Sequence, residues 1–183
     1  MAKTMKLTAL LSAVLTVIFA VIYRLNGRGI FLPIAITCGA VAYHFIMRLA
    51  VGHTVNAIMH NRADYTKRWF RLHGFEEGLY RRLGVKNWKE KLPAYDPSLF
   101  SVKEHGFEEI AQATCQAEIV HEVIAVLSFL PIAAAARFGE FAVFLVTSVA
   151  AACFDLLFVM IQRYNRPRLT RIAQKTENKK TAS

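Results

Sequence analysis

Three titratable residues lie close together in the second half of the sequence. Glu118, His121 and Glu122 are spaced by three and four positions, so a helix places them on one face. A carboxylate beside a histidine raises the basicity of the imidazole and fixes its tautomer, as a general base that deprotonates a hydroxyl requires. The alternative is a helix entry whose polar groups reach out to water.

The same residues also match part of a metal site. A Glu-x-x-His pair on a bundle helix is typical of di-iron carboxylate proteins, which combine two such pairs with two further glutamates. This chain has one pair, and His44 and Asp155 are the further groups that its apolar stretches contribute. We therefore predict no metal ligands and keep a metal centre as the less favoured alternative.

A second polar cluster lies near the C-terminus and contains Gln162, Arg163, Asn165, Arg166 and Arg168. Arginine grips phosphate or carboxylate with a planar fork of donors, and amides hydrogen-bond sugars or carbonyl oxygens. The combination of arginines with amides favours a binding role over a stop-transfer anchor, because an anchor requires only Lys or Arg. The proline after Arg166 predicts that the helix ends there.

Three more polar residues interrupt otherwise apolar stretches. Arg48 and His44 are four apart and share a helix face, and Asp155 lies about two helical turns before Gln162. Ionisable residues in such stretches are costly and usually functional. We predict that Asp155 orients Arg48 or His44, or lines the substrate pocket.

Four apolar stretches must position these residues, and they cover residues 7–23, 29–47, 119–136 and 141–161. Each is near the length of about 20 residues that crosses a hydrocarbon layer. Because backbone polar groups cannot stay unpaired in lipid, each stretch should be helical. The sequence therefore predicts an all-α integral membrane bundle of four transmembrane helices, the first retained rather than cleaved as a signal peptide.

The basic residues predict the orientation of this bundle. Of the 23 Lys and Arg residues, 20 fall at the N-terminus, between the second and third stretches, or after the fourth. The positive-inside rule then places both termini and residues 52–117 in the cytoplasm. Attraction to anionic lipid explains the net charge of +10 without a nucleic-acid partner.

Residues 52–117 are too many for a plain connection. Aromatic and basic residues mix in its first half, which predicts two interfacial helices over residues 53–83 with a break near Gly74. Pro93 predicts an extended or turning chain, and residues 104–117 predict a helix that continues into the third apolar stretch.

We predict one membrane domain over residues 1–173, followed by a polar tail over residues 174–183. The tail contains lysines, threonines and amides with no large apolar residue to bury, which predicts disorder.

Two stretches resemble the signatures of a known family. Gln116–His121 and Ile161–Thr170 are similar to those of the glycosyl-4,4'-diaponeurosporenoate acyltransferases, small bacterial membrane enzymes of the staphyloxanthin type of carotenoid pathway. Val85–Lys89 is similar to the basic-Trp-Lys segment of that family, and the resemblance covers roughly residues 75–175. The positions that match the functional residues of the family are Trp88, Lys89, Glu118, His121, Gln162, Arg163, Asn165 and Arg166.

The resemblance implies a membrane enzyme that moves a fatty acyl chain onto a hydroxyl of a glycosylated lipid or carotenoid. His121, oriented by Glu118, would remove the hydroxyl proton, and the arginines with Asn165 would hold the anionic part of the donor or the developing oxyanion. The expected substrate-binding residues are Gln162, Arg163, Asn165, Arg166, Arg168, Trp88, Lys89, Asp155, Glu122, His44 and Arg48.

We expect no tightly bound cofactor, an acyl donor such as acyl-CoA as cosubstrate, and the bilayer of a bacterial cell membrane as surroundings. No Gly-x-Ser-x-Gly motif is present and neither Cys38 nor Cys153 lies near a base, which favours direct transfer over a covalent acyl-enzyme. The family pattern has an aromatic residue where this chain has Glu122, so a different glycolipid acceptor stays open.

Two other functions stay open at this point. Another lipid-modifying enzyme, of the methyltransferase or reductase type, would bind a soluble cofactor at the arginine cluster. A non-enzymatic bundle that binds anionic lipid would need only positive charge at the same place.

Overall fold

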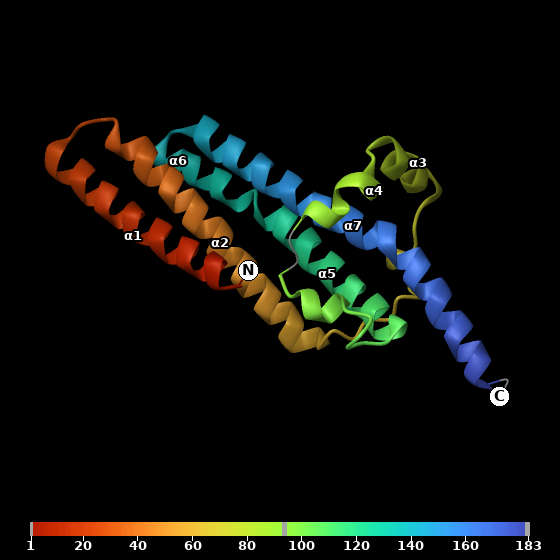
Figure 1. Cartoon of the computed structure of the whole chain (residues 1–183). Helices are drawn as coiled ribbons and strands as arrows, with labels where there is room; N and C mark the ends of the chain where they lie inside the picture. The colour runs from red at the N-terminus through yellow and green to blue at the C-terminus, as the bar shows by residue number, and fades with distance from the viewer. Residues whose placement is uncertain (1, 93–94, 182–183) are drawn as a thin grey trace. The chain divides into compact units, whose positions relative to one another are not determined.

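The structure is a computed structural model that describes residues 2–92 and 95–181, and every regular element in these ranges is a helix (Figure 1). The long helices are α1 (Ala2–Asn26), α2 (Phe31–Met59), α5 (Phe107–Leu127) and α7 (Phe141–Thr181). The shorter ones are η1 (Arg68–Phe70), α3 (Gly74–Arg82), α4 (Val85–Trp88), η2 (Lys89–Lys91), η3 (Pro97–Phe100), η4 (Leu130–Ala134) and α6 (Ala135–Phe138). The all-α prediction is confirmed.

Four helical segments are long and apolar enough to cross a membrane, and each overlaps one of the four predicted stretches, although the second begins at Phe31 rather than at residue 29. They run over Lys3–Asn26, Phe31–Met59, Phe107–Phe138 and Phe141–Thr176. Each segment is longer than predicted, because polar turns continue the helices beyond the apolar residues that a bilayer requires.

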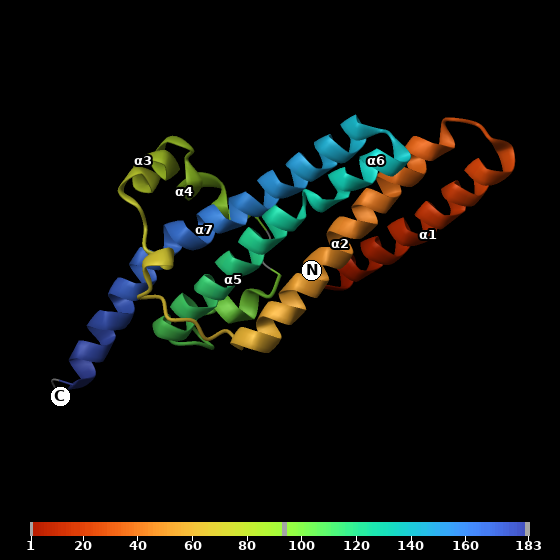
Figure 2. The same cartoon turned by 180° about the vertical axis from the view of Figure 1, so that it is seen from behind.

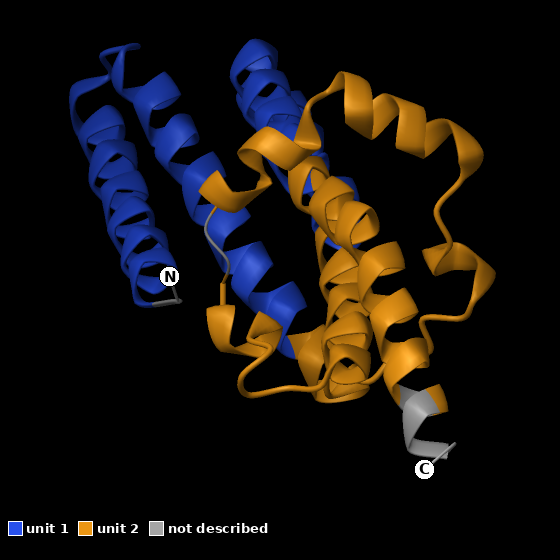
Figure 3. Cartoon of the chain, turned by 45° about the vertical axis from the view of Figure 1, so that its right-hand side comes forward, with its two compact units in different colours: residues 1–53, 122–155 blue, residues 54–121, 156–183 orange. Residues whose placement is uncertain are grey.

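The chain divides into two compact units (Figure 3). Unit 1 comprises residues 1–53 and 122–155, and unit 2 comprises residues 54–121 and 156–183. The prediction of one membrane domain over residues 1–173 stays a prediction.

Within unit 1, α1 and the start of α2 form a helical hairpin (Figures 1 and 2). The turn between them begins at Gly27, whose positive φ of 64° suits glycine. A Cβ at Gly39 would lie 3.4 Å from the Thr16 methyl group, so the missing side chain allows the two helices to approach closely. Most large apolar side chains of α1 are exposed, as a lipid-facing helix requires.

The third apolar stretch is interrupted, whereas we predicted one continuous helix over residues 119–136. Helix α5 ends at Leu127, and η4 and α6 follow. Pro131 is the reason, because it lacks the N–H that would bond to the carbonyl of Leu127 in an α-helix. The hydroxyl of Tyr43 donates to that freed carbonyl at 2.8 Å instead.

Unit 2 contains the segment between the second and third apolar stretches. Helix α2 continues through His53 to Met59, so the prediction of a separate interfacial helix from His53 is wrong. It ends where His60 and Asn61 both adopt positive φ. The predicted break near Gly74 is confirmed as the start of α3.

The helix predicted to begin near residue 104 and continue into the third apolar stretch is confirmed as α5. The prediction for Pro93 lies outside the described residues.

Helix α7 passes through Pro167, so the prediction that the helix ends there is wrong. Proline removes one backbone hydrogen bond but its fixed φ is compatible with a helix, and packing of the surrounding turns outweighs that loss. Helix α7 also includes residues 174–181 of the polar tail. The disorder predicted for that tail stays a prediction.

Candidate functional site

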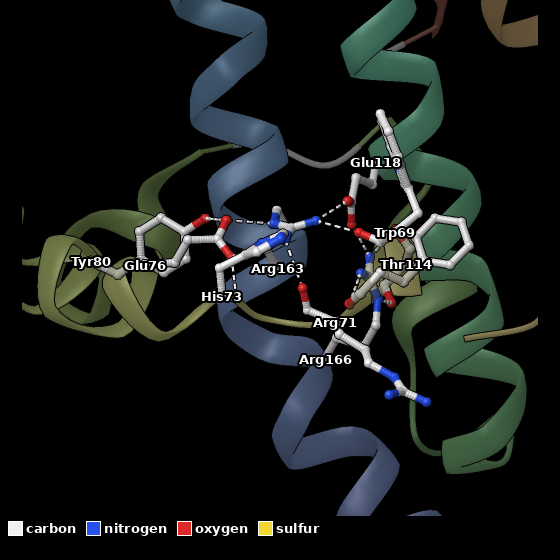
Figure 4. Close-up of polar contacts among 10 residues, drawn as sticks. Trp69, Arg71, His73, Glu76, Tyr80, Thr114, Glu118, Arg163 and Arg166 are labelled. Atoms are coloured by element: carbon white, nitrogen blue, oxygen red, sulfur yellow. Dashed lines mark hydrogen bonds and ion pairs between the residues drawn. The ribbon is translucent and has the colours of Figure 1, made fainter. Parts of the chain in front are cut away.

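The two polar clusters meet in unit 2, where α5 and α7 are joined by buried charges (Figure 4). Glu118 on α5 is fully buried, with 0% of its surface exposed. Its Oε1 accepts a hydrogen bond from Arg163 Nη1 at 2.6 Å, and its Oε2 forms an ion pair with Arg166. A buried carboxylate is costly unless it is paired, and two guanidinium groups provide that pairing here.

Arg163 is the centre of this network. Its Nε and Nη2 donate to the two carboxylate oxygens of Glu76 at 2.7 and 2.9 Å. Its Nη1 also donates to the carbonyl of Trp69, and Nη2 to the carbonyl of Arg71, both at 2.9 Å. Together with Glu118, these acceptors engage all the N–H groups of the guanidinium.

The guanidinium of Arg166 has nearly as many protein acceptors as that of Arg163. Its Nε and Nη2 donate to the hydroxyl and the carbonyl of Thr114, each at 3.1 Å, and its Nη1 donates to the carbonyl of Phe70 at 3.0 Å. The guanidinium carbon lies 5.1 Å from the ring centroid of Phe70, a cation–π distance. Arg166 therefore holds η1 and α5 against α7.

Glu76 and Tyr80 belong to this network, although neither was among the predicted site residues. Burial of Glu76 disfavours its charge, but hydrogen bonds from Arg163, the His73 backbone and the Tyr80 hydroxyl lower the pKa of its carboxyl to about 2. Burial and the hydrogen bond to Glu76 raise the pKa of Tyr80 to about 12.

The sequence does contain one signal for Glu76. His73 precedes α3, and Glu76 follows three residues later, which is the spacing of an N-terminal capping box. The Glu76 carboxylate accepts the His73 backbone N–H at 2.6 Å. Its second partner, Arg163, is 87 residues away and could be found only in the folded chain.

His121, the predicted general base, is half-buried one turn along α5 from Glu118. Its ring stacks on Phe158 of α7, with centroids 4.6 Å apart and planes inclined by 10°. Both oxygens of Glu118, the predicted orienting group, contact arginine. The contact that positions the His121 ring in the structure is therefore the stacking on Phe158, and Glu118 is engaged by the two arginines instead. Glu122, the third member of this cluster, is half-buried and falls in unit 1.

Two other predicted residues are brought together from distant parts of the sequence. Lys89 Nζ donates to Asn165 Oδ1 at 2.7 Å and lies 5.1 Å from the ring centroid of Tyr164. Trp88, beside Lys89, donates its indole N–H to the carbonyl of Leu83 at 3.0 Å.

The remaining members of the C-terminal cluster differ in burial. Gln162 is 9% exposed, and its helical spacing places it between Phe158 and Asn165 on one face of α7. Arg168 is exposed.

His44, Arg48 and Asp155 lie in unit 1. Arg48 forms an ion pair with Asp155, one of the two partners that we predicted for this carboxylate, and also donates to the carbonyl of Ala151 at 3.3 Å. His44 is buried, and its backbone carbonyl accepts from Arg48 at 3.3 Å. Among the described residues, no group of three or more His, Cys, Asp or Glu side chains is placed to hold a metal ion.

Residues 66–175 match a known protein family. The sequence model of a family described as glycosyl-4,4'-diaponeurosporenoate acyltransferase matches residues 66–175, which is more than half of the chain. No curated protein and no solved structure matches the chain. The matched range includes η1, α3, α5 and the part of α7 that carries Arg163 and Arg166, and so contains the whole buried charge network.

Proposed function

Because the chain belongs to the glycosyl-4,4'-diaponeurosporenoate acyltransferase family, we propose that it transfers a fatty acyl group to a hydroxyl of a glycosylated lipid or carotenoid. The observation that carries the proposal is the buried pairing of Glu118 with Arg163 and Arg166. It joins the two polar clusters of the sequence, and both lie inside the family match.

We assign the general base to His121. The new ester bond forms between the acceptor oxygen and the acyl carbonyl carbon, while the bond from that carbon to the donor's leaving group breaks. The acceptor oxygen must lose its proton in this step, and a neutral imidazole accepts it and returns it to the leaving group. Stacking on Phe158 fixes the plane of the His121 ring, and the ring nitrogens lie at the edge, outside the stacked faces.

We assign a positioning role to Glu118, Arg163 and Arg166. From the sequence we predicted that the arginines bind the acyl donor directly, but every N–H group of the Arg163 guanidinium already has a protein acceptor. The network sets the register of α5 against α7, and thereby the place of His121. For the anionic part of the donor we propose Lys89, held beside Asn165, and the exposed Arg168.

We place the reaction at a bacterial cell membrane, with both termini and the site on the cytoplasmic side. The four apolar helical segments and the one-sided distribution of basic residues support this placement. The acyl donor, such as acyl-CoA, is then a soluble cosubstrate, and the acyl product stays in the lipid.

The test is His121→Ala, compared at equal expression with His53→Ala. His53 is an exposed histidine of α2 and serves as the matched control. Loss of a general base lowers the rate about 10²- to 10⁴-fold. We expect mass spectrometry of lipid extracts to show the acylated glycolipid in cells with the wild-type chain or the control, and not in cells with His121→Ala. Undiminished product with His121→Ala would contradict the assignment.

A further inference from the structure

Helix α3 exposes an apolar face. Phe75, Leu79 and Leu83 are spaced by four residues, so they line one side of the helix and its C-terminal cap. Their exposed fractions are 72%, 42% and 47%. Isolated exposed apolar residues are common on proteins, but three on one face of a short helix form a surface that a partner or a lipid phase can cover.

The neighbouring face of α3 explains why the apolar residues point outward. Glu76 and Tyr80 are buried, and Glu76 is bound to Arg163 of α7 (Figure 4). A short amphipathic helix in a water-soluble domain packs its apolar side inward. In α3 a buried salt bridge attaches the helix to α7 instead, so its apolar side stays exposed and can contact lipid.

Exposed basic residues lie close to this face in the sequence: Arg82 is three residues after Leu79 and shares its side of α3, whereas Arg81 is four residues after Glu77 and lies on the other side. Arg81 and Arg82 occupy the last turn of α3, Lys86 lies in α4, and Arg71 precedes the helix. Glu77 is the exposed acidic residue of α3. Apolar side chains flanked by Lys and Arg are the composition of helices that lie in the headgroup region of anionic membranes.

We infer that α3 docks on an anionic lipid surface, with Phe75, Leu79 and Leu83 at the boundary between headgroups and acyl chains. Arg82 and Lys86 then face lipid phosphates. The positive charge around the apolar face is complementary to lipid phosphates, and the four apolar helical segments keep the chain at a bilayer. This inference does not depend on the acyl-transfer reaction.

The test uses tryptophan fluorescence of the full chain in vesicles. The sequence has two tryptophans, Trp69 and Trp88, which are both replaced by Phe to give a silent background. The probe variant then carries Phe75→Trp, an aromatic exchange at an exposed position. The matched control carries Glu77→Trp, two residues away on another face of α3.

In vesicles of phosphatidylcholine and phosphatidylglycerol, we expect the Phe75→Trp probe to emit at shorter wavelength and to be quenched by lipids brominated in the upper acyl chain. The Glu77→Trp control should emit as a solvated indole and be quenched by iodide instead. Leu79→Trp provides a second probe should the first not fold, as judged by circular dichroism. Arg82→Gln with Lys86→Gln should reduce bromine quenching in the anionic vesicles.

Two results would overturn the inference. One is an exposed indole at position 75 or 79, quenched by iodide as in the control. The other is a short-wavelength emission that brominated lipid does not quench, which would mean that a protein surface covers this face.

Discussion

At the scale of single residues, four charges alternate through the interior of unit 2. Glu76 and Glu118 each bind Arg163, and Glu118 also binds Arg166, so two negative and two positive groups neutralise one another. Their side chains are at most 10% exposed. Loss of one member leaves its partner charged, buried and unpaired, which costs more than the pair contributes.

Glu76→Gln is the sharpest test of this arrangement. The substitution keeps the size of the side chain but removes the charge opposite Arg163, and we expect it to destabilise the fold by about 3 kcal/mol. Glu77→Gln is the matched control, because Glu77 is the exposed neighbour and should change stability by less than about 0.5 kcal/mol. Thermal unfolding of the detergent-solubilised proteins measures both. Equal midpoints for the two variants would contradict a structural role for Glu76.

The pKa shifts of Glu76 and Tyr80 predict how stability depends on pH. The pKa of Glu76 is lowered from 4.5 to about 2, so its contribution is present above 4.5 and is lost as pH falls from there towards 2. The pKa of Tyr80 is raised from 10.0 to about 12, so its contribution is present below 10.0 and is lost as pH rises towards 12.

Unfolding curves across pH check these two windows. Glu76→Gln should remove the Glu76 part of the acid-side loss, and Tyr80→Phe should remove the Tyr80 part of the alkaline-side loss. An acid-side profile of Glu76→Gln that matches the wild type would show that the carboxylate is not linked to folding.

At the scale of elements, two prolines in the apolar helical segments have opposite consequences. Pro131 ends α5, and the hydroxyl of Tyr43 binds the carbonyl that the α-helix leaves free. Pro167 does not end α7, which continues to Thr181. The turn before Pro167 is held by Arg163 and Arg166, each bound to several groups of unit 2. Tertiary contacts thus maintain a helix that the local sequence disfavours.

Pro167→Ala should therefore stabilise the protein. Alanine restores the backbone N–H that bonds to the carbonyl of Arg163, and the gain should be about 1–3 kcal/mol. Pro33→Ala is the control, because Pro33 lies in the first turn of α2, where a backbone N–H has no helical partner in any case. A higher midpoint for Pro167→Ala alone is the expected result, and a lower one would show that the fold needs the proline.

At the scale of the whole molecule, most basic residues fall in alternate segments between the four apolar stretches. The basic residues Lys3, Lys6, those of residues 48–117 and those after residue 161 make up 20 of the 23. The other three are Arg24 at the end of α1, Arg28 in the loop after it, and Arg137 in α6. This distribution supports the proposal that both termini and the segment with α3 and α4 face the cytoplasm.

Cysteine labelling tests that orientation. In a background without Cys38, Cys115 and Cys153, we predict that Gly29→Cys and Arg137→Cys react with a membrane-impermeant maleimide on intact spheroplasts. Lys91→Cys, an exposed position of η2, should react only after permeabilisation. The reverse pattern would invert the proposed topology and place the candidate site outside the cell.

The sequence by itself determined the helical class, the four apolar segments and the identity of the two polar clusters. Hydrophobic runs and helical spacing are local properties, so they can be read without coordinates. It also offered the pairing of Asp155 with Arg48 as one of three alternatives, because a charge in an apolar stretch requires a partner.

Only the tertiary structure decided which charges pair in unit 2. Arg163 meets Glu76 across 87 residues of sequence and Glu118 across 45, and no periodicity encodes such contacts. The same contacts turned the arginines from predicted substrate ligands into proposed positioning residues, and they added Glu76 and Tyr80 to the site. The physical reason is that a buried charge is costly unless it is paired. The fold determines which group lies close enough to pair with it, and the local sequence does not specify that group.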